Sequence, residues 1–540
     1  MDNFRRPKRS SQNDSVDGFV RRRMRGSHNS LDEKGGESVA ESRIGNFSRA
    51  EGFKPRKTGQ IKPDGRSLGR RKPAPEIKLD DISMKDIPKN NRKRPKKNWK
   101  KMAKRTSLGL AMLVILIGGY LGLKGYLRAK QIFQGGGSAL AWDCNPDPAK
   151  LTGEGDGRVN FLLLGKGGPE QSDGPDLTDT IIVASLDPCN KEAGLLSIPR
   201  DLAVKMDSGE TTKINAVYAL TKQGAEYNGK TEDEAEKEGI EAIEKSVENI
   251  TGIPINFYTM IDFTAFEQAV NSVGGIEIDV QTPVYEQMSL HGKPYTLDVE
   301  TGVQQFDGLR ALAYSRSRYT SDRGDFSRSE RQREIIVALQ QKVFSLGTFS
   351  NPVKISQLMD SFGGRVTTNL NIPDDVSKLY EIGQEIGPSQ IKSVSLVDEP
   401  NVLIESGSYG NLGSIQVPVE GIFRYDDIQR FVRTTFVDGF IKKENPGIIV
   451  LNGTTVSSLA KNAAEDLQGY GYNVIEVGDA PTKDTTSTIV VDLGKKDTKY
   501  TKRYLELRYG TTATKQLPEG IAAPEGADFV IIMGQDEAGN

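Results

Sequence analysis

The sequence predicts an α/β protein that follows a single membrane-spanning helix. Two observations carry this prediction. From residue 159 onward, apolar β-type runs alternate with helical patterns, which is typical of an α/β or α+β domain with a central sheet. Before that region, an uncharged apolar stretch follows a strongly basic tail. The 540 residues leave room for more than one domain, and the net charge of −1 argues against a chain that binds polyanions over its whole length.

Residues 1–99 form the predicted tail. They are rich in Arg, Lys, Ser, Gly and Pro and poor in aromatic residues, so they cannot bury enough apolar surface to offset chain entropy. We expect a disordered cytoplasmic segment. Its charge fits acidic lipid headgroups or nucleic acid, and we favour the lipid surface.

Residues 106–127 form the predicted membrane span. TSLGLAMLVILIGGYLGL carries no charge and is about as long as a helix needs to cross a bilayer. The dense basic run at 91–105 places the N-terminus in the cytoplasm and the chain from about residue 128 outside the cell membrane. A cleaved signal peptide is a poor alternative because the segment begins about a hundred residues into the chain. A buried helix of a soluble domain is the remaining alternative.

The elements of the outer region follow from hydrophobic periodicity. We expect strands at 159–165, 179–187 and 194–201, then a helix at 234–252 with one apolar stripe. A strand at 255–263, a helix at 265–275 and a strand at 276–280 come next. Further on we expect two helices around a turn within 356–387, a strand at 391–397 and a linker at 438–447.

Histidine and cysteine are scarce, with two of each. His28 and His291 are too few for a histidine-rich metal site, and a Ser-His-Asp triad would depend on His291, which is expected in an exposed turn. Cys144 and Cys189 both lie on the outer side, where disulfides persist. The sequence leaves open whether the two form a bridge.

Arginine is concentrated at 311–339, where six arginines precede an apolar helix pattern. Alternation predicts an extended segment that points Arg316 and Arg318 to one side. A Ser-x-x-Glu capping box at 327–330 predicts the start of a helix whose inward stripe begins with Arg328 and Gln332. Guanidinium groups at a helix N-terminus are suited to a phosphate-type anion. Arg323 is predicted to lie on the surface, and Arg331 and Arg333 are predicted to be solvated or paired with Glu330 and Glu334.

Several motifs, in order, resemble the LytR-CpsA-Psr family of wall-polymer ligases. They are DTIIVASLDP, LLSIPRDL, KINAVYA, GIPINFYTMIDFTAF, VGGIEIDV, ALAYSRSR and GDFSRSERQR. The resemblance is close over 155–345 and extends to about 435. From residue 446, PGIIVLNGTTVSSLAKNAAEDLQGYGYNVIEVGDA resembles the small LytR C-terminal domain.

The resemblance implies an α-β-α layered domain with a central mixed sheet at 150–437, outside the membrane, and a small α/β domain at 446–540. It also implies a transfer reaction. Such enzymes move a glycopolymer from a polyprenyl pyrophosphate carrier to a peptidoglycan hydroxyl, with Mg²⁺, and form a phosphodiester. The implied partners are the lipid-linked glycan, peptidoglycan and the membrane. Nucleic acid is not expected, because the arginine cluster lies outside and the tail has no helix-turn-helix pattern.

The family's site residues map onto matching positions. Asp179 matches the aspartate that binds Mg²⁺ and serves as a base. Lys213 and Asn215 match a further motif near the site. The positions that match the family's pyrophosphate-binding residues are Arg200, Arg316, Arg318, Arg328 and Gln332.

Two positions depart from the family pattern. Gly167 stands where the family has a second metal-binding aspartate, and Leu177 stands where it tends to have arginine. In the Gly/Pro loop that follows, Asp173 or Asp176 is the candidate replacement carboxylate, and we take Asp176 with Asp179 as the candidate metal ligands. Lys166 is the candidate replacement for the missing positive charge.

Two other functions remain open at this stage. A pyrophosphatase that hydrolyses the carrier needs the same grip on the pyrophosphate, because water and a sugar hydroxyl attack the same phosphorus. A non-catalytic envelope protein that binds carrier lipid or wall polymer, and serves assembly or regulation, needs the binding surface alone.

Overall fold

The computed structural model describes residues 136–169, 174–318, 325–345, 364–371, 374–397, 401–410 and 412–539. A six-stranded sheet with the strand order β11-β6-β1-β2-β3-β12 forms the centre of the larger domain. The sheet is mixed, because β1 runs antiparallel to β2 and parallel to β6, while β3 runs parallel to β12. The central mixed sheet expected from the sequence is therefore confirmed.

The elements of this domain fall close to their expected positions. The strands of the sheet are β1 (Val159–Lys166), β2 (Thr178–Asp187), β3 (Glu192–Ser197), β6 (Phe257–Asp262), β11 (Val366–Thr368) and β12 (Ile391–Val394). The helices packed on it are α2 (Ile214–Tyr227), α3 (Glu232–Thr251), α6 (Asp325–Ser345), α8 (Asp374–Glu385) and α9 (Asp426–Thr435). Two helices were expected within 356–387, and the first of these predictions is wrong in part. The end of that segment forms strand β11, and its earlier residues, up to 363, lie outside the described residues.

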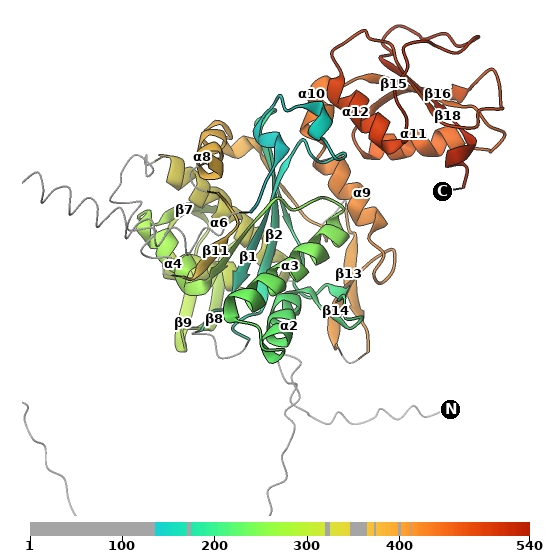
Figure 1. Ribbon diagram of the computed structural model, residues 1–540. Coiled ribbons are helices and arrows are strands. Elements are labelled where there is room, and N and C mark those ends of the chain that lie inside the picture. Colours follow the sequence, from blue (N-terminus) through green and yellow to red (C-terminus); the bar gives the residue numbers. More distant parts are fainter. Residues whose placement is uncertain are drawn as a thin grey trace, which may run out of the picture. The chain divides into compact units, whose positions relative to one another are not determined.

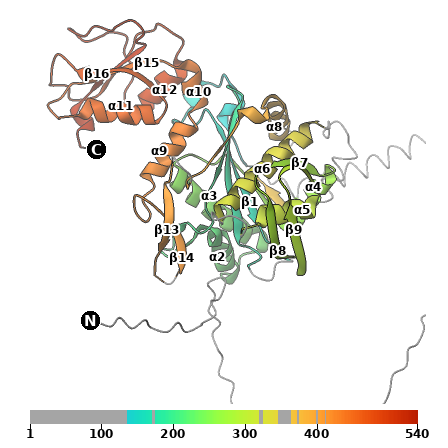
Figure 2. The ribbon, with the colours of Figure 1, turned by 180° about the vertical axis from the view of Figure 1, so that it is seen from behind.

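Helices cover both faces of the sheet, as the two opposite views show (Figures 1 and 2). On one face α2 and α3 bury a core that includes Leu162 and Ile181 of the sheet and Ile240 of α3. On the other face Ile336 of α6 packs against a core that contains Ile182. Strands that are buried on both sides have near-continuous apolar sequences, which is why β1 and β2 are recognisable from sequence. The α-β-α layering is confirmed.

Helix α3 illustrates how local sequence sets an element. Thr231 and Glu234 form a reciprocal capping box at its start, and Gly252 ends it with a left-handed backbone (φ 69°). The buried stripe follows the helical period and consists of Ile240, Ile243, Val247 and Ile250. The signals at both ends and along the stripe agree, so the predicted helix is confirmed.

Glu244 on α3 makes stability depend on pH. Burial, and the nearby carboxylates of Glu248 and Glu241, raise the pKa of Glu244 from its ordinary 4.5 to about 7. The folded chain therefore keeps a proton that the unfolded chain has lost, and the free energy of unfolding falls as pH rises through this window. We expect Glu244→Gln to raise the free energy of unfolding by about 1 kcal/mol at about pH 8, because water still screens part of the side chain, and to change it little near pH 4. Denaturant titration at both pH values tests this, with Glu465→Gln, at a side chain that is 62% exposed, as control.

A second layer of strands, made of β7, β8, β9 and β10, flanks α6. In this layer α4 (Phe263–Ser272) and α5 (Gly308–Arg316) share one apolar core with these four strands. Two further hairpins, β4–β5 and β13–β14, stand apart from this layer. His291 lies in the turn between β8 and β9, as expected. The strands are β4 (Ala203–Lys205), β5 (Thr211–Lys213), β7 (Ile276–Val280), β8 (Val284–Leu290), β9 (Lys293–Val299), β10 (Gly302–Phe306), β13 (Ile404–Ser408) and β14 (Ser414–Pro418).

Cys144 and Cys189 form a disulfide, with their Cα atoms 5.3 Å apart. Cys189 lies in the turn between β2 and β3, and Cys144 lies in the segment that precedes β1. The question left open by the sequence is thereby answered. The bridge fastens the entry of the domain to the β2–β3 turn.

The C-terminal domain is a four-stranded sheet in the order β16-β15-β18-β17, in which β15 runs parallel to both neighbours. Its expected strand, helix and strand after residue 446 are confirmed. Its elements are β15 (Gly447–Asn452), α11 (Leu459–Gly469), β16 (Asn473–Asp479), β17 (Ile489–Asp492), α12 (Lys499–Arg508) and β18 (Phe529–Met533).

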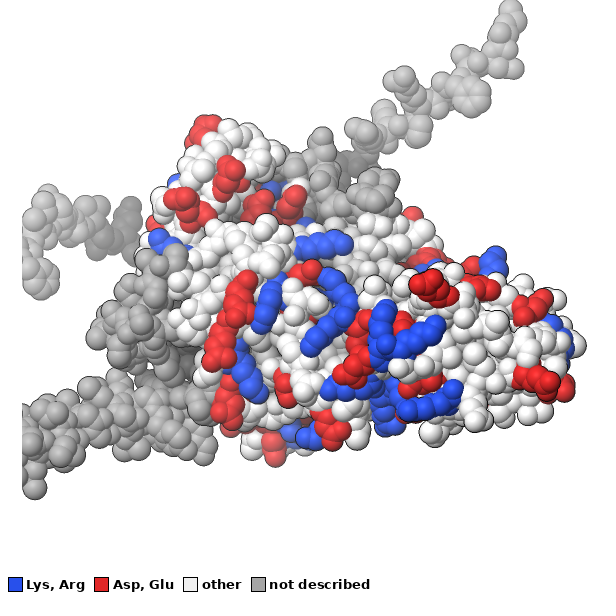
Figure 3. Space-filling view, turned by 90° about the horizontal axis from the view of Figure 1, so that it is seen from above, with Lys and Arg blue, Asp and Glu red and all other residues white. Residues whose placement is uncertain are grey.

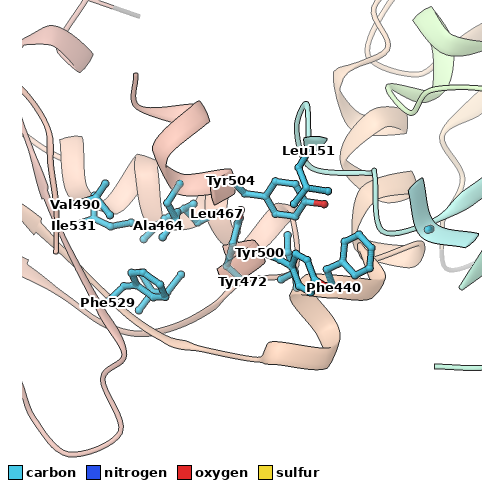
Figure 4. Close-up of a cluster of buried hydrophobic side chains, with 14 of the residues drawn as sticks. Leu151, Phe440, Ala464, Leu467, Tyr472, Val490, Tyr500, Tyr504, Phe529 and Ile531 are labelled. Atoms are coloured by element: carbon cyan, nitrogen blue, oxygen red, sulfur yellow. The ribbon is translucent and has the colours of Figure 1, made fainter. Parts of the chain in front are cut away.

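The linker expected at 438–447 is wrong. Residues Gly439–Glu444 form helix α10, and Phe440 and Ile441 on it are buried. Phe440 stacks on Tyr500 of α12, and Figure 4 shows both rings close to Leu151 and Tyr504. Charged, Pro and Gly residues gave the segment the composition of a linker, but its apolar residues belong to a core that both domains share.

Charges on the described surface are mixed in sign. Figure 3 shows basic and acidic side chains interleaved on the upper face. Lys442 lies 2.5 Å from Glu192, and Lys191 lies 2.5 Å from Glu385. On this face, an anion site therefore has to come from local geometry rather than from a broad region of positive charge.

The predicted membrane span at 106–127 lies outside the described residues. Among the residues that are described, no helix combines the length and the apolar character required to cross a bilayer.

Candidate functional site

Asp179 lies at the start of β2, where the pairing with β1 is irregular. Gly165 pairs with Thr180 and Lys166 pairs with Thr178, so Asp179 is the extra residue of a β-bulge. Bulges redirect side chains at sheet ends. Here the Oδ1 atom of Asp179 accepts hydrogen bonds from Arg200 Nη1 (2.7 Å) and from Asn215 Nδ2 at the start of α2 (3.2 Å).

Arg200 follows β3 and is fixed by two carboxylates. Its Nη1 contacts Asp179, and its Nε lies 3.5 Å from Asp201 Oδ2. The other oxygen of Asp201 lies 2.8 Å from Lys213 Nζ. Asp201 therefore bridges two cations of the site, which gives it a positioning role.

Arg316 is the last residue of a helix, and Arg318 lies two residues beyond the end of that helix. Asp307 accepts a hydrogen bond from the backbone N–H of Arg310 and so caps α5, which ends at Arg316. The expected alternation is wrong because residues 311–314 are all buried, and a helix that is apolar all round leaves no periodic stripe.

The end of α5 still brings Arg316 to the site. The Arg316 guanidinium lies 4.7 Å from the centre of the Phe263 ring and donates to Ser289 O (3.4 Å). The backbone N–H of Arg318 donates to Glu286 Oε2 (2.7 Å). Burial lowers the pKa of Arg316, and the charges that also shift it include those of Asp179, Arg318 and Arg200. Arg316 is thus close to the groups with which it was expected to act.

Helix α6 contributes Arg328 and Gln332 from successive turns. Arg328 is 4% exposed, and its Nη2 donates to the backbone carbonyl of Asp179 (3.3 Å). Gln332 Nε2 donates to Thr180 Oγ1 (2.9 Å) and to Ser315 O (3.3 Å). The helix begins at Asp325, so Ser327 is inside it and the capping box expected at its start is wrong.

Arg331 and Arg333 are buried, at 7% and 6% exposure, and their predicted solvent exposure is wrong. Arg331 donates to Ser317 O and lies 5.7 Å from the centre of the Tyr314 ring. Arg333 donates to Ser197 Oγ (3.0 Å). Helix α6 packs between the central sheet and the second layer of strands, so more than one of its faces is buried. These two arginines hold the helix in place. Arg323 lies outside the described residues.

The charge at the site is predominantly positive. Burial alone would raise the pKa of Asp179, but the charges of Arg200 and Arg328 outweigh it. Hydrogen bonds from Arg200 and Asn215 add to this effect, so the pKa of Asp179 lies below its ordinary value. One carboxylate thus lies near three guanidinium groups, those of Arg200, Arg316 and Arg328, from three separate segments. Such an arrangement is suited to a small anion with several oxygens.

Asp176 lies three residues before Asp179 and sits between two lysines. Its Oδ1 is 3.0 Å from Lys166 Nζ, and its Oδ2 is 3.4 Å from Lys222 Nζ. Lys166 Nζ also lies 3.3 Å from the hydroxyl of Tyr218. Tyr218 and Lys222 did not emerge from the sequence, although they follow Asn215 on α2 at spacings of three and seven residues, respectively, and so share its face.

The donor set fits a magnesium ion that the substrate helps to hold. Asp179 Oδ2 accepts no hydrogen bond from the described residues, and Mg²⁺ is often held by one carboxylate together with substrate phosphates. Both oxygens of Asp176, in contrast, contact ammonium groups. Within the described part of the chain no three His, Cys, Asp or Glu residues cluster as a metal cage. Asp173 lies outside the described residues.

Two family models match this sequence, and together they cover most of the described residues. The model of the LytR_cpsA_psr family matches residues 136–416, and the model described as LytR cell envelope-related transcriptional attenuator matches residues 446–536. The polyisoprenyl-teichoic acid–peptidoglycan teichoic acid transferase TagV of Bacillus subtilis is 32% identical over 43% of this chain and 54% of its own length. The cell wall biosynthesis protein LcpA of Corynebacterium glutamicum is 28% identical over 59% and 62%.

These curated relatives are matched over only part of their own length, 54% and 62%. Among solved structures, that of B. subtilis TagV is 26% identical and covers 53% of this chain and 98% of its own, with a TM-score of 0.39. Other relatives carry regulatory names, such as the regulatory protein MsrR of Staphylococcus aureus, at 25% identity over 45% of this chain and 65% of its own length. The first family model alone spans more than half of the sequence. This chain therefore belongs to the LytR-CpsA-Psr family and ends in a LytR C-terminal domain.

Proposed function

We propose that this chain is a phosphotransferase that moves a glycopolymer from a polyprenyl pyrophosphate carrier to a hydroxyl of peptidoglycan. The observation that carries the proposal is the approach of Arg200, Arg316 and Arg328 to Asp179 from three different segments. Relatives named as teichoic acid transferases, from Bacillus subtilis and Enterococcus faecalis, support the reaction class.

The proposed reaction has one bond formed and one broken at phosphorus. A peptidoglycan hydroxyl attacks the phosphorus that bears the glycan, and the bond from that phosphorus to the bridging oxygen breaks. The product is a phosphodiester, and polyprenyl phosphate leaves with the electron pair of the broken bond. The protein's task is to hold the pyrophosphate in line and to neutralise its charge, which the arginine cluster is placed to do.

Asp179 is the proposed acceptor of the hydroxyl proton. Its lowered pKa keeps it ionised at neutral pH, so it can accept a hydrogen bond from the incoming hydroxyl. A bound pyrophosphate would draw Arg200 toward its own oxygens, and this would raise the basicity of the carboxylate as the reaction begins.

Asp179 is the one protein ligand that we propose for magnesium. Oδ2 of Asp179 would hold the ion together with substrate oxygens, and the ion would offset part of the pyrophosphate charge. Gln332 and Lys213 are proposed to bind phosphate oxygens beside the arginines.

The proposed location is the outer side of the cell membrane, with the N-terminus in the cytoplasm and residues 106–127 as the anchor. The bridge between Cys144 and Cys189 supports this placement, because disulfides persist in oxidising compartments. A carrier lipid in the same membrane would then present its head group on the side where the site lies.

Product analysis tests the proposal. The purified full chain is mixed with a lipid-linked glycan, an acceptor glycan and Mg²⁺, and the products are separated by mass. A glycan–phosphate–glycan product is expected. Free phosphorylated glycan instead would identify a hydrolase, and the absence of turnover with tight binding of the lipid would identify a binding protein.

A further inference from the structure

The Asp176 carboxylate holds two ammonium groups, one on each oxygen. Lys166 comes from the end of β1, and Lys222 comes from the third turn of α2. The lysine side chains are 17% and 13% exposed, while that of Asp176 is 34% exposed. Both lysine side chains are therefore largely buried, while the Asp176 carboxylate between them is still accessible to solvent.

This cluster continues the arginine site along α2. Asn215, Tyr218 and Lys222 lie on one face of the helix. Asn215 contacts Asp179, Tyr218 contacts Lys166, and Lys222 contacts Asp176. The helix rises about 10 Å over these seven residues, so the lysines are neighbours of the arginine cluster and not a separate surface feature.

The chemistry of the cluster disfavours a metal at Asp176. A divalent cation there would have to displace one ammonium group and remain close to the other, which like charges oppose. A phosphate oxygen, in contrast, is attracted by both ammonium groups, because an ammonium is a compact point charge that binds phosphate well. Glu226 lies 3.9 Å from Lys222 but is 46% exposed, so water weakens its competition.

We infer that Lys166 and Lys222 form an ammonium subsite for phosphate oxygens of the carrier's pyrophosphate, with Asp176 as their positioning residue and not as a magnesium ligand. The inference rests on the proposed function, since it concerns the same bound head group. Its consequence is that the pyrophosphate is held largely by protein cations, so that binding persists when Mg²⁺ is removed.

Calorimetric titration of the full chain with inorganic pyrophosphate, in EDTA and in Mg²⁺, tests the inference. In EDTA, the double variant Lys166→Met, Lys222→Met is expected to bind at least about tenfold more weakly than the parent. Asp176→Asn keeps the shape but removes a competing negative charge, so it is expected to bind about threefold more tightly in EDTA.

Two results would overturn the inference. One is a double variant that binds in EDTA within about twofold of the parent. The other is an Asp176→Asn variant that is weakened only when Mg²⁺ is present, as a lost metal ligand would be. Circular dichroism and thermal unfolding establish that each variant is folded. Lys245→Met on α3, which breaks an exposed pair with Asp207, is the matched control.

Arg200→Ala separates this inference from the proposed function. If Arg200→Ala loses pyrophosphate binding while the lysine variant keeps it, only the ammonium subsite is wrong. If Arg200→Ala also binds like the parent, the pyrophosphate binds elsewhere and the proposed function fails with it.

Discussion

Arg200→Ala is expected to lower kcat for glycan transfer by about 10²–10³, the loss typical when one preorganised donor to developing charge is removed. Arg200 is fixed from two sides, by Asp179 at 2.7 Å and by Asp201 at 3.5 Å, so it is oriented before the substrate arrives. Its removal also leaves Asp179 without its closest cation. Steady-state kinetics with a lipid-linked glycan and an acceptor glycan measure the change.

Two further variants sharpen this experiment. Arg200→Lys keeps the charge, but one ammonium group cannot reproduce the two-sided contact, so a smaller loss in kcat is expected. Arg430→Ala removes an exposed arginine of α9 that pairs with Asp427, and it should leave kcat unchanged. A kcat for Arg200→Ala equal to that of the parent would contradict the proposed role of the arginine cluster.

Asp438→Ala is expected to reduce the free energy of unfolding by about 3–5 kcal/mol, because it leaves several buried hydrogen-bond donors without an acceptor. Asp438 is 4% exposed and accepts hydrogen bonds from five groups. The donors are the backbone N–H groups of Gly155 (2.9 Å), Gly157 (2.8 Å), Phe440 (2.8 Å) and Ile441 (3.1 Å) and the hydroxyl of Tyr504 (3.2 Å). Alanine would leave these donors buried without an acceptor. Denaturant titration followed by circular dichroism measures the loss.

Asp427→Ala is the matched control, because it removes a half-exposed carboxylate on the neighbouring helix α9. Its effect should stay within about 0.5 kcal/mol, as for most surface substitutions. Asp438→Asn keeps one acceptor oxygen and should fall between the two. A loss for Asp438→Ala no larger than that of the control would mean that the junction contributes little to stability.

The layered fold was predictable because several local signals agreed. Helix α3 has a capping box, an apolar stripe and a terminal glycine, and all three place it at the same residues. Strands β1 and β2 are apolar throughout because helices cover both faces of the sheet. Where local and tertiary constraints coincide in this way, one sequence is sufficient to locate an element.

The failures have an equally physical cause. Helix α5 is buried all round at residues 311–314, so its period was invisible and the segment resembled a strand. Arg331 and Arg333 were assigned to solvent because charge usually marks an exposed face, yet α6 packs on two sides. In segment 438–447, composition favoured a linker although Asp438 and Phe440 are buried between domains.

The candidate site was predictable as a set of residue types but not as a network. Asp179, Arg200 and Arg328 emerged from the resemblance, and the structure brings them together. The positioning role of Asp201 and the partners of Asp176 depend on contacts between segments far apart in the chain. Only the spacing of Lys222 from Asn215 on α2 offered a signal in the sequence.

The junction between the two domains has a mechanical consequence. Glu154, in the segment before β1, accepts hydrogen bonds from Tyr472 and Arg508 of the C-terminal domain, and Glu444 accepts from the first backbone N–H groups of α12. Apolar side chains from both sides of this boundary also pack into one core. Pulling the two domains apart would therefore expose buried apolar surface as well as break these hydrogen bonds.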